Sequence, residues 1–194
     1  GGSRTGGTSG TSGTSGSGGG TIILDFYGQL VENTMWNTHG AIDAAHSGLT
    51  AEEIVTVTNK IKLQYAPYNI VVTTDEAIFN ATPIGKRQRI IFTESYEWYG
   101  EGAGGVAYLG SFKWTSEAPA FVFTTLLNYN THMIGEAGSH ETGHTLGLRH
   151  QSICDNGVIT SQYNWGDGVN APIMGSSYGV PLGSWWIGPT PLGC

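Results

Sequence analysis

Three histidines at fixed spacing are the residues of this chain best suited to chemistry. His140 and His144 are four residues apart, so a helix would carry both imidazoles on one face. Gly147 can adopt a positive φ without steric cost, which lets the helix end and brings His150 back as a third nitrogen ligand. Three neutral imidazoles leave the fourth position of a tetrahedral zinc ion open for water, as in catalytic zinc sites. The spacing therefore predicts one catalytic Zn2+ rather than a buried helix that happens to carry histidines.

Glu141 directly follows the first of these histidines and is not needed as a ligand. A carboxylate beside the water of such a site can accept its proton as a general base and later return it to a leaving group. We therefore predict that Glu141 is the catalytic residue.

The whole pattern, H-E-x-x-H-x-x-G-x-x-H over residues 140–150, resembles the zinc signature of the metzincin metalloproteases. That family also has a methionine beneath the metal, in a Met-turn downstream. Met174, 24 residues after His150, matches this feature, and the alternative is a methionine that fills a gap in the core. Gln151 matches no major subfamily. Tyr178 follows the methionine by four residues, whereas some subfamilies have a tyrosine ligand after two, so the subfamily stays unassigned.

The resemblance implies a zinc-dependent endopeptidase that acts on proteins or peptides. Two other functions remain open. One is a non-catalytic zinc-stabilised binding or adhesion module that keeps the protease fold, and the other is a hydrolase of non-peptide amides. Glu141 favours an enzyme, because a structural zinc site requires no general base.

Composition limits the remaining possibilities. The chain has 194 residues, of which 39% are hydrophobic and 12% charged, so it can bury a core of ordinary domain size. Its formal charge of −7 argues against a nucleic-acid partner. The sequence contains no run of about 18 apolar residues, so no transmembrane segment is predicted. The one basic cluster, residues 86–89, is interpreted as the solvated start of a strand, and nothing indicates an oligomeric state.

Three segments are expected along the chain. Residues 1–20 are glycine, serine and threonine apart from Arg4, which is typical of a flexible linker, and they contain no apolar region of a signal peptide. Residues 21–147 are expected to form an N-terminal catalytic subdomain that contains the zinc helix. Residues 148–194 would form a C-terminal subdomain with the third histidine and the Met-turn.

Local sequence patterns predict the helices and strands that must position the three histidines and Glu141. A capping box of Thr50 and Glu53 predicts a helix that ends before Pro67. The zinc helix is expected from about 133 to 146. Apolar, β-branched runs predict strands at the following ranges: 21–27, 69–74, 89–93, 106–112 and 120–126. Residues 29–48 are expected to form a long loop, with His39 and His46 as surface residues rather than a second metal site.

The order strand, helix, strand favours a parallel pair with a right-handed crossover. With the metzincin resemblance it predicts an α/β (α+β) fold: a twisted, mostly parallel five-stranded sheet with an antiparallel edge strand, two main helices and a small irregular C-terminal subdomain. The resemblance makes the fourth strand the edge that lines the cleft. Substrate backbone is therefore expected to bind along Val106, Ala107, Tyr108, Leu109 and Gly110.

Cys154 and Cys194 could form a disulfide, could both be free, or Cys194 could pair outside this chain. Proteases of the type that this chain resembles are usually exported. That favours the disulfide and a secreted, cell-surface or periplasmic location. Asp155 and Asp167 lie in turns where calcium could bind, and we interpret them instead as caps of loops.

Overall fold

The computed structural model describes residues 19–100 and 102–194. Most of the expected linker, residues 1–18, therefore lies outside the described residues. Gly20, which the linker was expected to include, is the first residue of the first strand.

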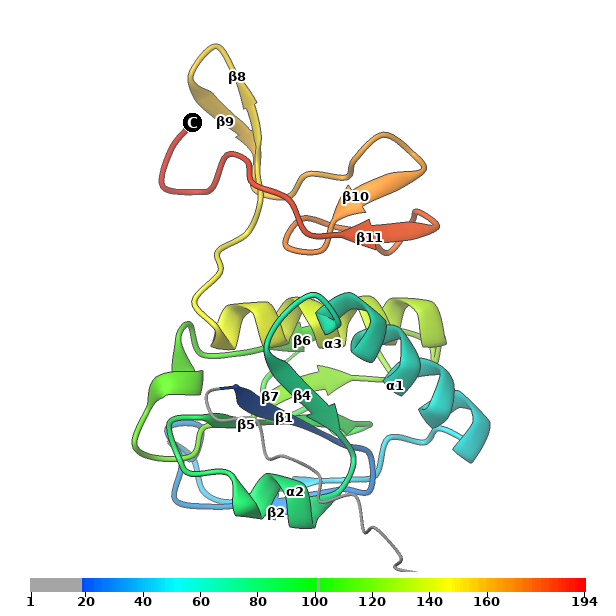
Figure 1. The fold of residues 1–194 in the computed structure, drawn as a ribbon, viewed down its shortest axis with the longest axis vertical. Helices are drawn as coiled ribbons and strands as arrows, with labels where there is room; N and C mark the ends of the chain where they lie inside the picture. The colour runs from blue at the N-terminus through cyan, green and yellow to red at the C-terminus, as the bar shows by residue number, and fades with distance from the viewer. Residues whose placement is uncertain (1–18, 101) are drawn as a thin grey trace, which may run out of the picture.

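A five-stranded sheet forms the centre of the fold (Figure 1). Its spatial order is β4 (Ile70–Thr73), β1 (Gly20–Asp25), β5 (Arg87–Thr93), β7 (Ala120–Phe123) and β6 (Gly105–Val106). The first four strands are parallel, and β6 pairs antiparallel with β7. This confirms the predicted α/β class, with a mostly parallel sheet whose antiparallel edge is the fourth of its strands along the chain.

Two main helices cover one face of this sheet (Figure 1). Helix α1 (Ala51–Tyr65) begins at the expected capping box, in which Thr50 accepts from the Glu53 amide and the Glu53 side chain accepts in return. Helix α3 (Thr131–Thr145) begins at Asn130, whose side chain accepts a hydrogen bond from the third residue of the helix. Both predicted helices are therefore present.

Glycine allows α3 to approach its neighbours closely. A β-carbon on Gly138 would lie 2.7 Å from Cδ1 of Ile61 in α1 and 2.9 Å from Cζ of Phe92 in β5. Glycine inside a helix costs about 0.5–1 kcal/mol relative to alanine. At Gly138 this cost is offset by packing that no larger residue would allow.

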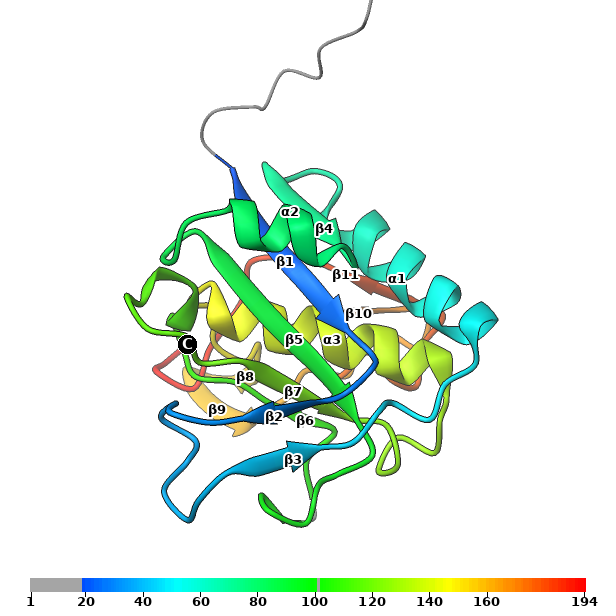
Figure 2. The same ribbon diagram turned by 90° about the horizontal axis from the view of Figure 1, so that it is seen from below.

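The opposite face of the sheet is covered by elements that the sequence patterns did not predict (Figure 2). The expected loop at 29–48 contains an antiparallel pair, β2 (Gln29–Val31) and β3 (Ile42–Ala44). These strands have three residues each, too few for an alternating pattern to be recognised. A short helix, α2 (Glu76–Ala81), was also missed, although Asp75 caps it by accepting from the Ala77 amide at 2.7 Å.

The prediction of a strand over 106–112 is wrong beyond Val106. After β6 the chain turns at Gly110, which has φ +77, and continues into a 3-10 helix, η1 (Ser111–Lys113). The Gly110 amide donates to the carbonyl of His144 at 2.9 Å, so it bonds to α3 and not to a strand. This tertiary hydrogen bond, which no local pattern reveals, ends the edge strand after two residues.

The basic cluster at 86–89 lies at the start of β5, as expected, but its two arginines are not solvated. Arg87 donates to Glu117 at 2.6 Å, and Arg89 donates to Asp25 at 2.9 Å. Both guanidinium groups lie over the ring of Phe79, 4.6 and 4.8 Å from its centroid. Their side chains are only 16% and 13% exposed, so these arginines stabilise the face of the sheet opposite α3.

The residues after α3 form two small sheets on the side of α3 that faces away from the main sheet (Figure 1). One is antiparallel, β8 (Ile153–Asp155) with β9 (Val158–Ser161), and the other is parallel, β10 (Asn170–Pro172) with β11 (Leu182–Ser184). Cys154 and Cys194 are joined by a disulfide, which closes this region. Among the described helices, none has the length and apolar character needed to cross a membrane.

Candidate metal centre

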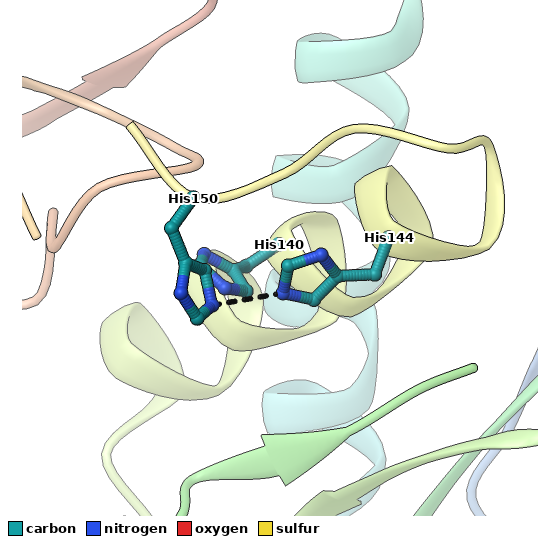
Figure 3. A group of neighbouring side chains, drawn as sticks. All are labelled: His140, His144 and His150. Atoms are coloured by element: carbon teal, nitrogen blue, oxygen red, sulfur yellow. Dashed lines mark hydrogen bonds between the residues drawn. The ribbon is translucent and has the colours of Figure 1, made fainter. Parts of the chain in front are cut away.

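The end of α3 brings the third histidine back toward the first two. Gly147 has φ +99, and its amide donates to the carbonyl of His144 at 2.9 Å. The amide of Leu148 donates to the carbonyl of Gly143, also at 2.9 Å. This pair of bonds is a Schellman motif, which reverses the chain where a glycine takes the left-handed conformation. As a result His150 lies over the face of α3 that carries the other histidines (Figure 3).

The three imidazoles converge on one point (Figure 3). One ring nitrogen from each of His140, His144 and His150 lies within 4.8 Å of the other two. Nε2 of His144 and Nε2 of His150 are 3.0 Å apart. Tetrahedral zinc with bonds of about 2.0–2.1 Å separates its ligand nitrogens by about 3.4 Å, so this set of side chains could hold a metal ion.

The other nitrogens of the first two rings face backbone carbonyls. Nδ1 of His140 lies 2.7 Å from the carbonyl oxygen of Ile173, and Nδ1 of His144 lies 2.8 Å from that of Leu148. A carbonyl only accepts, so each Nδ1 carries the proton and each Nε2 presents a lone pair. These contacts fix the tautomer that a metal ligand needs.

The third ring is oriented by a side chain. The amide group of Gln162 lies 2.8 Å from Nδ1 of His150. If Nε2 of His150 binds the metal, Nδ1 carries the ring proton and donates it to Gln162. The side-chain oxygen of Gln162 must then face Nδ1, which a 180° rotation of the amide group achieves without moving the rest of the side chain. The aromatic ring of Tyr163 also packs against His150 in a tilted arrangement, with ring centroids 4.4 Å apart. Neither residue was predicted, because their distance from the motif follows no helical or strand period.

Burial keeps these imidazoles neutral. It lowers the pKa of His140 to about 3 and that of His150 to about 4, and it also lowers the pKa of His144. The proximity of the rings adds to the effect for His140 and His150, because two positive charges would repel. Neutral imidazole is the form that binds a metal, so the site is suited to one at neutral pH.

Glu141 lines the same cleft as the three histidines, and one of its carboxyl oxygens makes no hydrogen bond within the described part of the chain. Its Oε2 is buried with no hydrogen-bond partner among the described residues, and burial raises the pKa of its carboxyl group to about 8. A β-carbon on Gly105 would lie 2.7 Å from Cγ of Glu141, so the edge strand lies directly against this side chain. An unpartnered buried carboxyl beside three neutral nitrogens fits a divalent cation, whose charge would offset the cost of burying a carboxylate.

Met174 is buried beneath this end of α3. Its Sδ is only 2.4 Å from the position that a β-carbon on Gly143 would take. The Met174 carbonyl accepts from the amide of Gln151, the residue after the third histidine, at 2.6 Å. The methionine is thus tied both to the helix that carries two of the histidines and to the segment that carries the third.

A cleft of about 420 Å3 opens in front of the three rings. Of the expected substrate-binding residues, Val106 and Ala107 line it, whereas Tyr108, Leu109 and Gly110 do not. Tyr108 donates its hydroxyl to the carbonyl of Met35 at 3.1 Å, outside this cleft. The aromatic side chains that do line the cleft are Tyr99, Tyr163, Trp165 and Tyr178.

Of the two aspartates considered for calcium, Asp167 caps a loop in the structure, whereas Oδ1 of Asp155 accepts from the side chain of Asn156 at 3.1 Å. Oδ1 of Asp167 accepts from the amides of Val169 and Asn170 at 2.9 and 2.8 Å. These bonds lower the pKa of Asp167. Within the residues that the structure describes, the three histidines are the one group of metal-binding type, and neither His39 nor His46 belongs to such a group.

Comparisons with known proteins give little beyond this geometry. No protein-family model matches the chain, and no curated protein does. Two solved structures of myroilysin are similar to it, each at 16% sequence identity. Their TM-scores are 0.37 and 0.34, with 69% and 75% of this chain covered. The chain spans about half of their length, 49% and 48%. At these values the likeness identifies neither a family nor a function.

Proposed function

We propose that this chain is a zinc-dependent endopeptidase of the metzincin type. The observation that carries the proposal is one arrangement: three imidazoles converge at the floor of an open cleft, with the unpartnered carboxyl group of Glu141 beside them. A structural zinc site is closed by four protein ligands, whereas a catalytic one keeps a position open. Three nitrogen ligands and a cleft therefore favour catalysis.

His140, His144 and His150 would hold the ion through Nε2, with Met174 supporting the site from below. Zinc in such a site acts as a Lewis acid, which polarises a substrate carbonyl and makes water a better nucleophile at neutral pH. Imidazole ligands suit zinc, although they suit copper, iron and nickel as well, so the choice of zinc rests on the motif.

Glu141 would accept the proton of the attacking water and transfer it to the leaving amine. A group that takes up and returns a proton works best when its pKa is near the working pH. Burial alone places the pKa of Glu141 at about 8. Its position against β6 puts the carboxyl between the metal ligands and the sheet edge where a peptide would lie.

The substrate would bind to the free edge of β6 by β-strand addition, a common way in which sheets bind extended peptides. The strand offers only two residues, so Val106 and Ala107 hold the backbone and the aromatic side chains of the cleft contact the substrate's side chains. A disulfide is typical of proteins in oxidising compartments, which supports a secreted, cell-surface or periplasmic location. Residues 21–147, extended by Gly20 at the start of β1, and residues 148–194 would form the two subdomains of this enzyme.

The competing function is a zinc-stabilised binding module. The two are separated by comparing the zinc-loaded protein with Glu141→Gln on a proteome-derived peptide library, with and without a chelator. We expect wild type to cleave, the variant to bind one zinc and not cleave, and the chelator to abolish cleavage. Glu52→Gln, on the exposed first turn of α1, is the control and should behave as wild type. Stoichiometric zinc without any cleavage by wild type would instead support the binding module, or an amidase if a non-peptide amide is hydrolysed.

A further inference from the structure

A second cavity adjoins the metal centre. It has a volume of about 300 Å3 and shares Ala107, His144 and His150 with the cleft. The rest of its wall consists of Leu109, Arg149, Gln162 and Pro191. A peptide lying in the cleft would therefore place one of its side chains here, next to the bond that is cut.

Arg149 is the charged group of this second cavity. Among the described residues that line the two cavities, Arg149 is the one that is positively charged when the imidazoles are neutral. Arg149 forms no salt bridge with any of the described residues. In contrast, Arg87, Arg89 and Lys60 each pair with a carboxylate.

The backbone around Arg149 is fixed relative to the metal centre. On one side, the Leu148 amide donates to α3; on the other, the Gln151 amide donates to the carbonyl of Met174. The intervening His150 converges with the other ring nitrogens. The guanidinium group of Arg149 therefore extends from a backbone that is fixed beside the metal ligands, within reach of a substrate bound there.

We propose that this cavity is a specificity subsite for an acidic residue of the substrate, with Arg149 binding its carboxylate. The inference rests on the proposed endopeptidase function and adds its substrate class: peptides with Asp or Glu at one fixed position near the cut. A guanidinium group binds a carboxylate through two parallel hydrogen bonds, which gives both energy and geometry. The side chains of Leu109 and Pro191 offer apolar contact to the methylene groups of such a residue.

The net negative charge of the protein would oppose the proposed preference for acidic peptides. With a net charge of −7, the general field of the molecule disfavours acidic peptides. A preference for Asp or Glu at one position, beyond any attraction of the zinc ion itself, therefore has to come from a second local cation. Arg149 is the cation that lines the wall beside the metal ligands.

The test uses the zinc-loaded chain and peptide pairs that differ only by Glu or Gln at each of the three positions on either side of the cut. Wild type should prefer Glu at one position by about tenfold or more in kcat/KM, the size expected for a charge-assisted hydrogen bond. Arg149→Gln should remove this preference, so that kcat/KM for the Glu peptide falls to the value for its Gln counterpart. Arg149→Glu should shift the preference at that position to Lys or Arg. Lys113→Gln, which removes an exposed cation of η1, is the matched control and should keep the preference.

Two failures have different meanings. If zinc-loaded wild type cleaves peptides without an acidic preference, or if Arg149→Gln keeps it, the subsite is wrong and the protease proposal stands. If the zinc-loaded protein cleaves no peptide, the proposed function is wrong and this inference falls with it. Zinc stoichiometry and circular dichroism of each variant show that the substitutions leave the fold and the metal centre intact.

Discussion

Gly143 and Met174 are in such close contact that any side chain at position 143 would force the methionine to move. A β-carbon there would be 2.4 Å from Sδ of Met174 and 3.5 Å from the ring of Trp185. One turn of α3, between the first two histidines, therefore rests directly on the methionine. This contact couples the helix to the segment after the third histidine.

Gly143→Ala should consequently destabilise the metal centre. Alanine improves helix propensity by about 0.5–1 kcal/mol, but overpacking costs about 1–3 kcal/mol, so we expect a net loss of stability and weaker zinc binding. Chemical denaturation and a zinc competition titration measure both. Gly179→Ala, where a β-carbon would meet nothing within 4 Å, is the control. Equal zinc affinity of the Gly143 variant and wild type would show that the methionine does not support the site.

Gln162 should control how His150 binds the metal. Gln162→Leu removes the acceptor for the Nδ1 proton, and loss of such a contact typically lowers metal affinity by about 10- to 100-fold. Gln162→Glu keeps an acceptor at the same place and should retain the affinity. The measurement is zinc affinity by competition with a chromophoric chelator. Equal affinities of the two variants would mean that the contact seen in the structure does not orient the ligand.

The disulfide should stabilise the region that contains Met174. Cys154 and Cys194 are 40 residues apart in sequence, and cross-linking a loop of that length is worth about 3–4 kcal/mol in the chain-entropy model. Cys154→Ser combined with Cys194→Ser should lower the free energy of unfolding by about this amount in zinc-loaded protein. Urea denaturation measures the change. A loss below about 1 kcal/mol would show that the disulfide contributes little to the stability of the C-terminal region.

The zinc-free protein should lose stability on acidification below pH 6.5. The pKa values of His140 and His150, about 3 and 4 when folded, lie below the ordinary 6.5, so the unfolded chain binds more protons between these values and stability falls with pH. Glu141 acts in the opposite direction, because its folded pKa of about 8 exceeds 4.5; its contribution is present below pH 4.5 and is lost as the pH rises toward 8.

Glu141→Gln separates these two effects. Without the opposing carboxyl group, the zinc-free variant should lose more stability than wild type between pH 6.5 and about 4.5. Denaturant midpoints of both proteins across this range provide the measurement. Parallel curves would contradict a raised pKa for Glu141.

The sequence predicts the parts of this protein whose signals are local. The capping box at Thr50 opens α1 as expected, and the histidine spacing with Gly147 describes the turn that the structure forms. The apolar, β-branched runs also predict strands where β1 and β7 form. In each case the residues that determine the structure are neighbours in the chain.

The sequence predictions fail where the local structure depends on contacts between residues that are far apart in the chain. The edge strand stops after Val106 because the Gly110 amide bonds to His144, 34 residues further along the chain. Gln162 and Tyr163 contact His150 through the fold of the C-terminal segment, for which the sequence gives only turn signals. Arg149 was inside the recognised motif, but only the cavity around it gives the residue a proposed role.

The most direct test of the metal centre is zinc K-edge X-ray absorption of the zinc-loaded protein. We expect one zinc per chain, with three imidazole nitrogens at about 2.0–2.1 Å and an oxygen that no protein residue supplies. His150→Ala should reduce the imidazole count to two. A spectrum with sulfur ligands, or with an imidazole count that His150→Ala leaves unchanged, would contradict the central claim.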